Sequence, residues 1–150
     1  QTCNFRDRAV AWVLFFAQAM YCYPMEACEV YTRRCSTLLN TIELATMGAT
    51  FAARSINPVT KKQVLTSSNT PFILAEMTME GMYGSSGDWA YTVGLPGKSG
   101  VGGGILAVVP GVMGIAAFSP PLDPVGNSVR GQKMVASVAQ QLGYNLYKGH

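Results

Sequence analysis

Charged residues are scarce in this sequence. Asp, Glu, Lys and Arg make up 13% of the 150 residues and hydrophobic residues make up 49%, whereas about 25% charged residues is usual for a globular domain. So few charges predict that much of the surface is covered, either by a partner subunit or by parts of the same protein outside this sequence. The net charge of +3 is small, and the basic residues lack interleaved aromatic side chains, which argues against nucleic-acid binding.

A long uninterrupted apolar run is missing as well. The best candidate, residues 9–25, contains Gln18 and Pro24 and falls short of the roughly 18–20 apolar residues that span a membrane. We therefore expect a helix over residues 6–20 that is buried on most faces, and no membrane partner. No signal peptide is recognisable, and a sequence that begins with Gln1 is expected to be a processed or trimmed product or a fragment.

Metal ligands are too few for a site. His150 is the single histidine, and Cys3, Cys22, Cys28 and Cys35 form neither a Cys-x-x-Cys pair nor a Cys/His pattern with metal-binding spacing. We therefore expect no metal and no cofactor. The cysteines are expected to be buried free thiols, which indicates a reducing compartment.

Hydrophobic periodicity predicts an α+β fold. Helix starts are marked by Asn40 or Thr41 with Glu43 in the first turn, and later by Asn127 or Ser128. Between them, alternating or continuous apolar runs indicate strands that form an antiparallel hairpin sheet, followed by a C-terminal helix. We expect helices at 6–20, 24–39, 40–54, 71–83 and 127–146, a loop at 55–71, turns at 85–88 and 122–127, and strands at 89–96, 99–111 and 113–121.

The stretch LPGKSGVGGG, residues 95–104, carries the clearest functional signal. A phosphate-binding loop would need a glycine five residues before Gly97 and a helix after the motif, and the sequence has neither. Two interpretations stay open. The stretch is a glycine-rich bulge in a buried strand, or it is the Lys-Ser-Gly wall of an active site, as in serine β-lactamases and penicillin-binding proteins. In the second case Lys98 supplies positive charge, and the backbone amides after it face the substrate carbonyl.

Enzymes of that fold use a serine nucleophile with a lysine three residues later, one helical turn on. The residues three positions before the lysines are Pro58, Val59, Leu95, Arg130 and Asn145. The sequence therefore contains no Ser-x-x-Lys. If the fold assignment holds, the nucleophile lies outside these 150 residues.

Residues 81–131 carry Gly-Met-Tyr, Val-Gly-Leu-Pro-x-Lys-Ser-Gly-Val-x-Gly-Gly, Ser-Pro-x-Leu-Asp and Gly-Asn-Ser-Val, and this combination resembles the serine-dependent glutaminase family. Residues 6–12, 30–36 and 56–65 resemble it more loosely. The resemblance implies a β-lactamase-like fold, hydrolysis of L-glutamine to L-glutamate and ammonia, and assembly as a homodimer or homotetramer. It covers about the C-terminal half of the family's catalytic domain. Residues 1–150 are therefore expected to be a single partial domain without the half that carries Ser-x-x-Lys.

The resemblance also assigns roles to individual residues. Tyr31 resembles a tyrosine that lines the glutamine pocket near the nucleophile. Tyr83 resembles the tyrosine that contacts the substrate and shares a proton with the Ser-Lys pair, a role that suits a phenol beside an ammonium group. Val101 resembles the valine whose backbone amide faces the substrate carbonyl as an oxyanion donor. Lys98 and Ser99 form the same wall of the site.

Several positions depart from the family pattern. Asp7 stands where the family has a substrate-binding asparagine. Its carboxylate would accept hydrogen bonds from the glutamine ammonium group but repel the α-carboxylate. Gly84 stands where an aspartate is usual, and Lys61, Glu80 and Gly97 replace a glycine, a cysteine and an alanine.

Two functions of different classes are therefore open. The first is a glutaminase that forms an acyl-enzyme on a serine supplied from outside this chain. The second is a catalytically inactive glutaminase-like fragment that acts as a binding or assembly module, an interpretation that Asp7 and the low charge favour. A relative acting on peptidoglycan would explain Lys-Ser-Gly but not the stretches around Tyr31 and 119–131. The expected location is intracellular, cytoplasmic rather than mitochondrial.

Overall fold

The computed structural model describes residues 4–148. Gln1, Cys3 and His150, which the sequence analysis singled out, lie outside the described residues. The chain divides into two compact units, Gln1–Leu39 and Asn40–His150, and each is described by itself. No helix within residues 4–148 combines the length and the apolar character that a membrane crossing requires.

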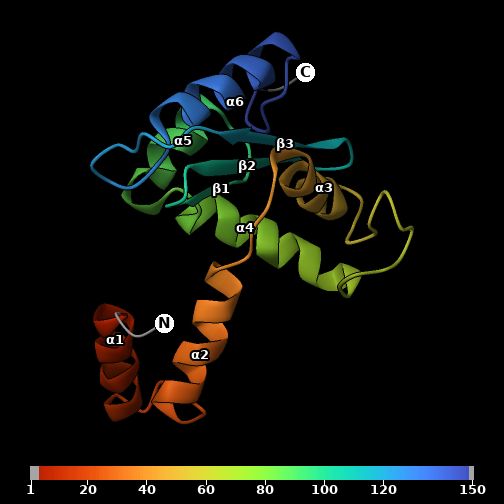
Figure 1. Ribbon diagram of the computed structural model, residues 1–150. Helices are drawn as coiled ribbons and strands as arrows, with labels where there is room; N and C mark the ends of the chain where they lie inside the picture. The colour runs from red at the N-terminus through yellow and green to blue at the C-terminus, as the bar shows by residue number, and fades with distance from the viewer. Residues whose placement is uncertain (1–3, 149–150) are drawn as a thin grey trace. The chain divides into compact units, whose positions relative to one another are not determined.

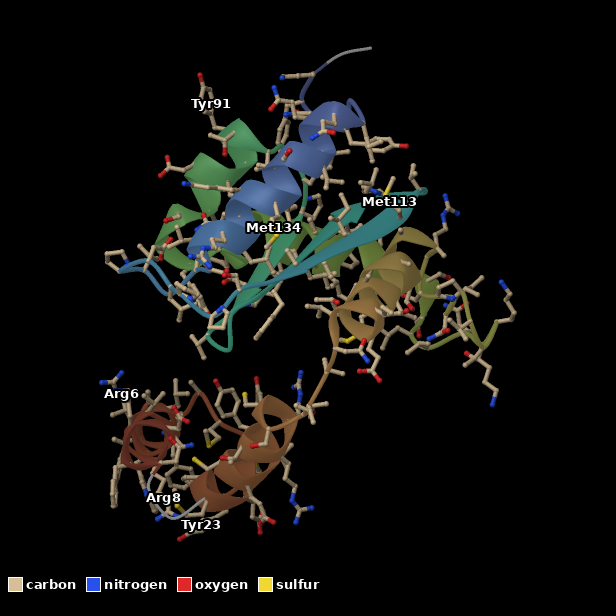
Figure 2. The ribbon with its side chains drawn as sticks, turned by 45° about the horizontal axis from the view of Figure 1, so that its top comes forward. Arg6, Arg8, Tyr23, Tyr91, Met113 and Met134 are labelled. Carbon is tan, nitrogen blue, oxygen red and sulfur yellow. The ribbon has the colours of Figure 1, made fainter. Side chains whose placement is uncertain are left out.

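The first unit is a pair of helices, α1 (Phe5–Phe16) and α2 (Pro24–Cys35), with Pro24 in the first turn of α2 as expected. Asn4 Nδ2 donates to Thr32 Oγ1 at 3.4 Å, and the Trp12 ring packs edge-on against Tyr23 with 5.8 Å between centroids. The expectation that this first helix is buried on most faces is wrong for this chain, because only Ala11 of α1 is buried. Figure 2 labels Tyr23 in this unit, together with Arg6 and Arg8 of α1.

The cysteines of this unit also differ from the expectation. Cys22, Cys28 and Cys35 are free thiols, but Cys22 and Cys35 are exposed and Cys28 is half-buried. The prediction of buried thiols is therefore wrong for these three residues. Cys28 is the least exposed of them because it lies on the face of α2 that meets α1, where its Sγ donates to the Asp7 carbonyl at 3.6 Å.

The second unit is built on a three-stranded antiparallel sheet in the order β1 (Gly97–Gly100), β2 (Gly104–Val109) and β3 (Met113–Phe118). Ser99 pairs with Ile105 and Ala107 pairs with Ile115. The run at 99–111 is not one strand as expected, because it folds back on itself between β1 and β2. Gly103 has a φ of +100°, which favours glycine, and its N–H donates to the Gly100 carbonyl at 2.8 Å to close the turn.

Helices cover both faces of this sheet (Figure 1). On one face α3 (Thr41–Ala52) and α4 (Thr70–Glu80) pack against Leu106 and Val108. On the other face α5 (Ser86–Thr92) and α6 (Val129–Gln141) pack against Ile105, Ala107 and Val109. Successive residues of β2 thus point into two different cores, as alternation along a strand requires. The prediction that its continuous apolar run marks a strand covered on both faces is confirmed.

Helix capping follows the sequence closely. Asn40 accepts from the Glu43 N–H while the Glu43 carboxylate accepts from the Asn40 N–H, so α3 starts in a capping box. Ser128 caps α6 by accepting from the Gly131 N–H at 3.1 Å. The apolar face expected on α6 is only partly buried, since Val135 is buried but Val138 and Leu142 are exposed. Two short 3-10 helices, η1 (Ser67–Asn69) and η2 (Tyr83–Ser85), precede α4 and α5.

The largest error of the sequence analysis concerns residues 85–96. Alternation of Trp89, Tyr91 and Val93 predicted a strand over 89–96, but Trp89 and Tyr91 lie in α5 and Val93 is its C-cap. Trp89 and Val93 are both buried in the core, whereas Tyr91 is 89% exposed and projects outward in Figure 2. A separation of four residues satisfies the helical period as well as the strand period. The Trp89 Nε1 also donates to the Leu95 carbonyl at 2.8 Å, which fixes the helix against the chain that follows it.

Candidate functional site

Tyr83 lies at the start of η2, between α4 and α5, and its backbone is unusual. Its φ is +54°, a left-handed conformation that costs a residue with a Cβ atom roughly 1–2 kcal/mol. Two bonds to one side chain hold it there. Ser86 Oγ accepts from the Met82 N–H at 3.0 Å and donates to the Tyr83 carbonyl at 2.8 Å. The Tyr83 side chain is 36% exposed, so its phenol is open to a bound molecule.

Lys98 lies beside Tyr83 because β1 runs past the end of α4. The Ser99 N–H donates to the Gly81 carbonyl at 2.9 Å, and this bond ties the end of α4 to the strand. The Lys98 Nζ is 4.8 Å from the centroid of the Tyr83 ring, within the range of a cation–π interaction, and it also donates to the Ser99 carbonyl. Partial burial lowers the pKa of the Lys98 ammonium group, because desolvation disfavours its charged form.

Val101 occupies the turn between β1 and β2, and its side chain is 72% exposed. Gly126 lies close to both Val101 and Tyr83. A Cβ placed on Gly126 would lie 3.6 Å from Tyr83 Cε2 and 4.0 Å from Val101 Cγ1. Tyr83, Lys98 and Val101 are therefore neighbours on one side of the second unit. The Ser99 side chain is buried next to them, and its Oγ has no hydrogen-bond partner in the structure.

Asp7 and Tyr31 belong to the first unit, where they line one hollow between α1 and α2. This hollow has a volume of about 420 Å³ and its other lining residues are mainly apolar. The structure thus gathers the sequence-derived site residues into two groups. One is Asp7 with Tyr31, and the other is Tyr83 with Lys98, Ser99 and Val101. The roles assigned to them stay predictions.

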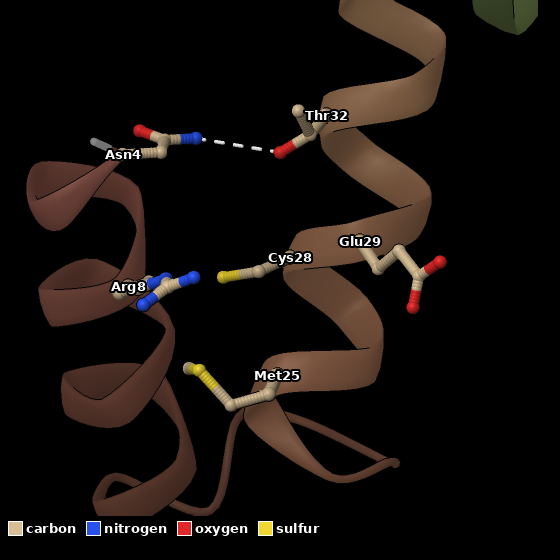
Figure 3. A pocket seen from close by; sticks show the side chains of 6 residues that line it. All are labelled: Asn4, Arg8, Met25, Cys28, Glu29 and Thr32. Carbon is tan, nitrogen blue, oxygen red and sulfur yellow. Dashed lines mark hydrogen bonds between the residues drawn. The ribbon is translucent and has the colours of Figure 1, made fainter. Parts of the chain in front are cut away.

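A second hollow of the first unit has a polar lining that the sequence analysis did not identify (Figure 3). It has a volume of about 370 Å³, and its lining includes Arg8 of α1 and Glu29 of α2. In Figure 3 Arg8 points toward Cys28, whereas the Glu29 side chain points away from α1. Cys28 lines both hollows. The helical spacing of Asn4 with Arg8 and of Cys28 with Thr32 could have indicated this grouping, because residues four apart share a helix face.

No group of three or more His, Cys, Asp or Glu side chains within residues 4–148 is placed to hold a metal ion. The second group offers the chemistry of its own side chains and backbone amides. A phenol beside an ammonium group can carry a proton, and backbone N–H groups in a turn can stabilise an oxyanion.

The sequence and the structure of this chain are similar to those of known proteins. A family model described as Glutaminase matches residues 1–147. Glutaminase 1 of Escherichia coli (strain K12) is 76% identical over 149 residues, which are 99% of this chain and 48% of that protein. A solved structure of the probable glutaminase YbaS has a TM-score of 0.97 and 76% identity, and again 99% of this chain covers 48% of that chain.

A more distant solved structure is the covalent complex between a Bacillus subtilis glutaminase and 5-oxo-L-norleucine. It is 32% identical with a TM-score of 0.92, and the match covers 97% of this chain and 52% of that chain. These neighbours have the β-lactamase-like fold, so the predicted α+β fold is confirmed. The chain spans about half the length of the curated relatives it matches.

Proposed function

The chain belongs to the glutaminase family, and on that premise we propose that the complete protein containing it hydrolyses L-glutamine to L-glutamate and ammonia. The observation that carries the proposal is the grouping of Tyr83, Lys98 and Val101 in the second unit. These are the positions to which the family resemblance assigns proton transfer, positive charge and oxyanion stabilisation. The left-handed backbone at Tyr83 also supports the proposal, because strained conformations cluster at functional sites.

The proposed mechanism passes through a serine acyl-enzyme. A serine Oγ attacks the side-chain amide carbon of glutamine, and the Val101 N–H stabilises the negative charge that develops on the carbonyl oxygen. The Tyr83 phenol relays the serine proton to the leaving ammonia, and Lys98 supplies positive charge beside it, with its Nζ 4.8 Å from the ring centroid. Water then hydrolyses the ester. Residues 1–150 contain no Ser-x-x-Lys, so the serine comes from outside them and the chain is one part of a catalytic domain.

The family resemblance assigns substrate binding to Asp7 and Tyr31 of the first unit, and it assigns contacts with the substrate to Tyr83 and Val101 as well. Asp7 and Tyr31 share one hollow, as expected if both contact the same ligand. A carboxylate at position 7 would attract the α-ammonium group of L-glutamine and repel its α-carboxylate. We expect the substitution Asp7→Asn to remove the repulsion and lower KM for L-glutamine about threefold to tenfold, the effect of a partly screened charge pair. An unchanged or higher KM would show that Asp7 does not face the substrate.

Release of ammonia from L-glutamine by the complete protein tests the function directly. The related Bacillus subtilis glutaminase forms a covalent complex by reaction with 6-diazo-5-oxo-L-norleucine, and this reagent supplies a second test. We expect the complete protein to release ammonia and to gain the mass of one 5-oxo-L-norleucine group, with activity lost in parallel. A folded complete protein that neither releases ammonia nor becomes labelled would refute the proposal.

A second candidate is a catalytically inactive glutaminase-like fragment that serves as a binding or assembly module. It is favoured by Asp7 and by the exposed apolar side chains of α1, such as Phe5, Val13 and Phe16, which need a cover in water. This candidate predicts glutamine binding or subunit assembly without turnover. Family resemblance also supports a homodimer or homotetramer and a cytoplasmic location, and sedimentation of the complete protein would test the assembly.

A further inference from the structure

The loop that precedes α6 is tied to the backbone next to Tyr83, and we propose that Asn127 in this loop is a positioning residue for the phenol of Tyr83. Asn127 is fully buried, with 0% of its surface exposed. Its Nδ2 donates to the Met82 carbonyl at 3.0 Å, across 45 positions of the sequence. The inference deepens the proposed function, because it concerns the residue assigned to proton transfer.

The bond from Asn127 completes a set of contacts around the Met82–Tyr83 segment. Ser86, three residues after Tyr83, binds the Met82 N–H and the Tyr83 carbonyl. These bonds are local and would move together with the segment. The bond from Asn127 is long-range, so it fixes the segment relative to the loop before α6 and hence relative to the rest of the second unit.

The backbone of Asn127 is held by hydrogen bonds that do not involve the Asn127 side chain. Asp123 Oδ1 accepts from the backbone N–H groups of Val125, Gly126 and Asn127 at 3.0, 2.9 and 2.9 Å, and Gln132 donates to Asp123 Oδ2 at 3.0 Å. The Asp123 N–H in turn donates to the Asn127 carbonyl at 2.8 Å. A substitution that changes only the Asn127 side chain therefore leaves the loop backbone with its ties intact.

The same loop also touches the side chain of Tyr83. Gly126, with a φ of +108°, lies close to one edge of the tyrosine ring and to Val101. Asn127 thus holds the backbone at Met82, and Gly126 lies against the ring of Tyr83. Without the bond to Met82, the Met82–Tyr83 segment keeps its local Ser86 bonds and its φ of +54°, but it can shift as a unit relative to the loop before α6. The phenol would then leave its place beside Lys98, and a displacement of about 1 Å at a reacting group lowers rates about 100-fold.

The test compares Asn127→Leu and Asn127→Asp with the unmodified complete protein. Leucine is similar in size and has no donor, so we expect kcat to fall about 10-fold to 100-fold while KM for L-glutamine changes less than about threefold. In Asn127→Asp a carboxylate cannot donate to the Met82 carbonyl, but a protonated carboxyl group can. We therefore expect kcat of this variant, relative to the unmodified protein, to recover as the pH is lowered.

A buried hydrogen bond elsewhere in the second unit provides the matched control. Ser55 Oγ and Thr70 Oγ1 lie 2.8 Å apart and both residues are buried, so Ser55→Ala also removes one buried bond. A general loss of stability would lower kcat equally in Ser55→Ala and Asn127→Leu, and that result would overturn the inference. We expect Ser55→Ala to keep kcat within about threefold of the unmodified protein and to show no recovery at low pH.

A crystal structure of the Asn127 variants gives a readout that does not depend on activity. We expect the Met82–Tyr83 segment to shift relative to the loop before α6 and the Tyr83 ring to move away from Lys98. An unchanged position of Tyr83, or an unchanged kcat in a folded variant, would overturn the inference. Failure of the unmodified protein to hydrolyse glutamine would refute the proposed function instead, and the crystal structure would still decide whether Asn127 sets the position of Tyr83. If the leucine variant does not fold, the aspartate variant supplies both readouts.

Discussion

The contact between Gly81 and Gly97 leads to a sharp prediction about the substitution Gly81→Ala. Gly81 follows α4 directly and has φ −67° and ψ −26°, a conformation that alanine adopts without strain. A Cβ at this position, however, would lie 1.7 Å from the Gly97 carbonyl oxygen and 2.2 Å from the Met77 carbonyl oxygen. Both obstacles are backbone atoms, so no side-chain rotation can relieve the contact.

The size of the effect follows from these distances. An ordinary contact between carbon and oxygen is close to 3.4 Å, so α4 and β1 would have to separate by more than 1 Å. Such overpacking costs about 1–3 kcal/mol. The hydrogen bond from the Ser99 N–H to the Gly81 carbonyl, 2.9 Å in length, would be lost as well, at about 1 kcal/mol. We therefore expect Gly81→Ala to lower the free energy of unfolding by about 2–4 kcal/mol.

Urea denaturation of the complete protein measures this loss, and Gly87→Ala is its matched control. Gly87 lies in α5 with no atom within 4 Å of the position that its Cβ would occupy. Alanine there should stabilise the helix by about 0.5–1 kcal/mol. A change from glycine to alanine is thus expected to lower the free energy of unfolding at position 81 and to raise it at position 87. Equal stabilities of Gly81→Ala and the unmodified protein would refute the close approach of α4 and β1.

Two further predictions concern the core and the loop before α6. Val135→Ala removes two buried methyl groups between α6 and the sheet. It should lower the free energy of unfolding, measured by urea denaturation, by about 2–3 kcal/mol. A loss below about 0.5 kcal/mol would mean that α6 packs loosely. Asp123 accepts hydrogen bonds from backbone N–H groups, first of all from Asn127, and from Gln132, which hold the pKa of its carboxyl below the usual 3.8. Because this pKa is lowered by folding, the carboxylate contributes stability above its unfolded pKa and loses that contribution as the pH falls through the lower, folded value. The difference in unfolding free energy between the unmodified protein and Asp123→Asn should therefore be largest near neutral pH and shrink in acid, and a difference that does not change with pH would contradict the assignment.

Much of the fold could be predicted from local chemistry. The starts of α3 and α6 follow from single residues, Asn40 and Ser128, whose side chains bind the first free N–H groups of their helices. Strand β2 was recognised from its apolar run. Residues 89–93 were misread because burial of Trp89 and Val93 fits both periodicities, so the sequence pattern does not distinguish a helix from a strand.

The candidate site was predictable only where the resemblance supplied its residues. Tyr83, Lys98 and Val101 were named in this way, and the structure brings them together. Asn127 was identified as a possible helix cap and as part of the Gly-Asn-Ser-Val motif, but no role in the site was assigned to it. Its bond to Met82 joins positions 45 residues apart, and neither the composition nor the periodicity of a sequence encodes such a contact.

The central position of β2 has a consequence for how the second unit opens. Its backbone pairs with β3 over Gly104–Val109 and with β1 over Gly104–Ala107, and its side chains from Ile105 to Val109 are buried. No local fluctuation can therefore expose its amide hydrogens to water. These amides should exchange with deuterium only through cooperative unfolding of the whole unit. The slowest-exchanging amides of Asn40–His150 then report its global stability, while those in the turn at 101–103 exchange through local opening.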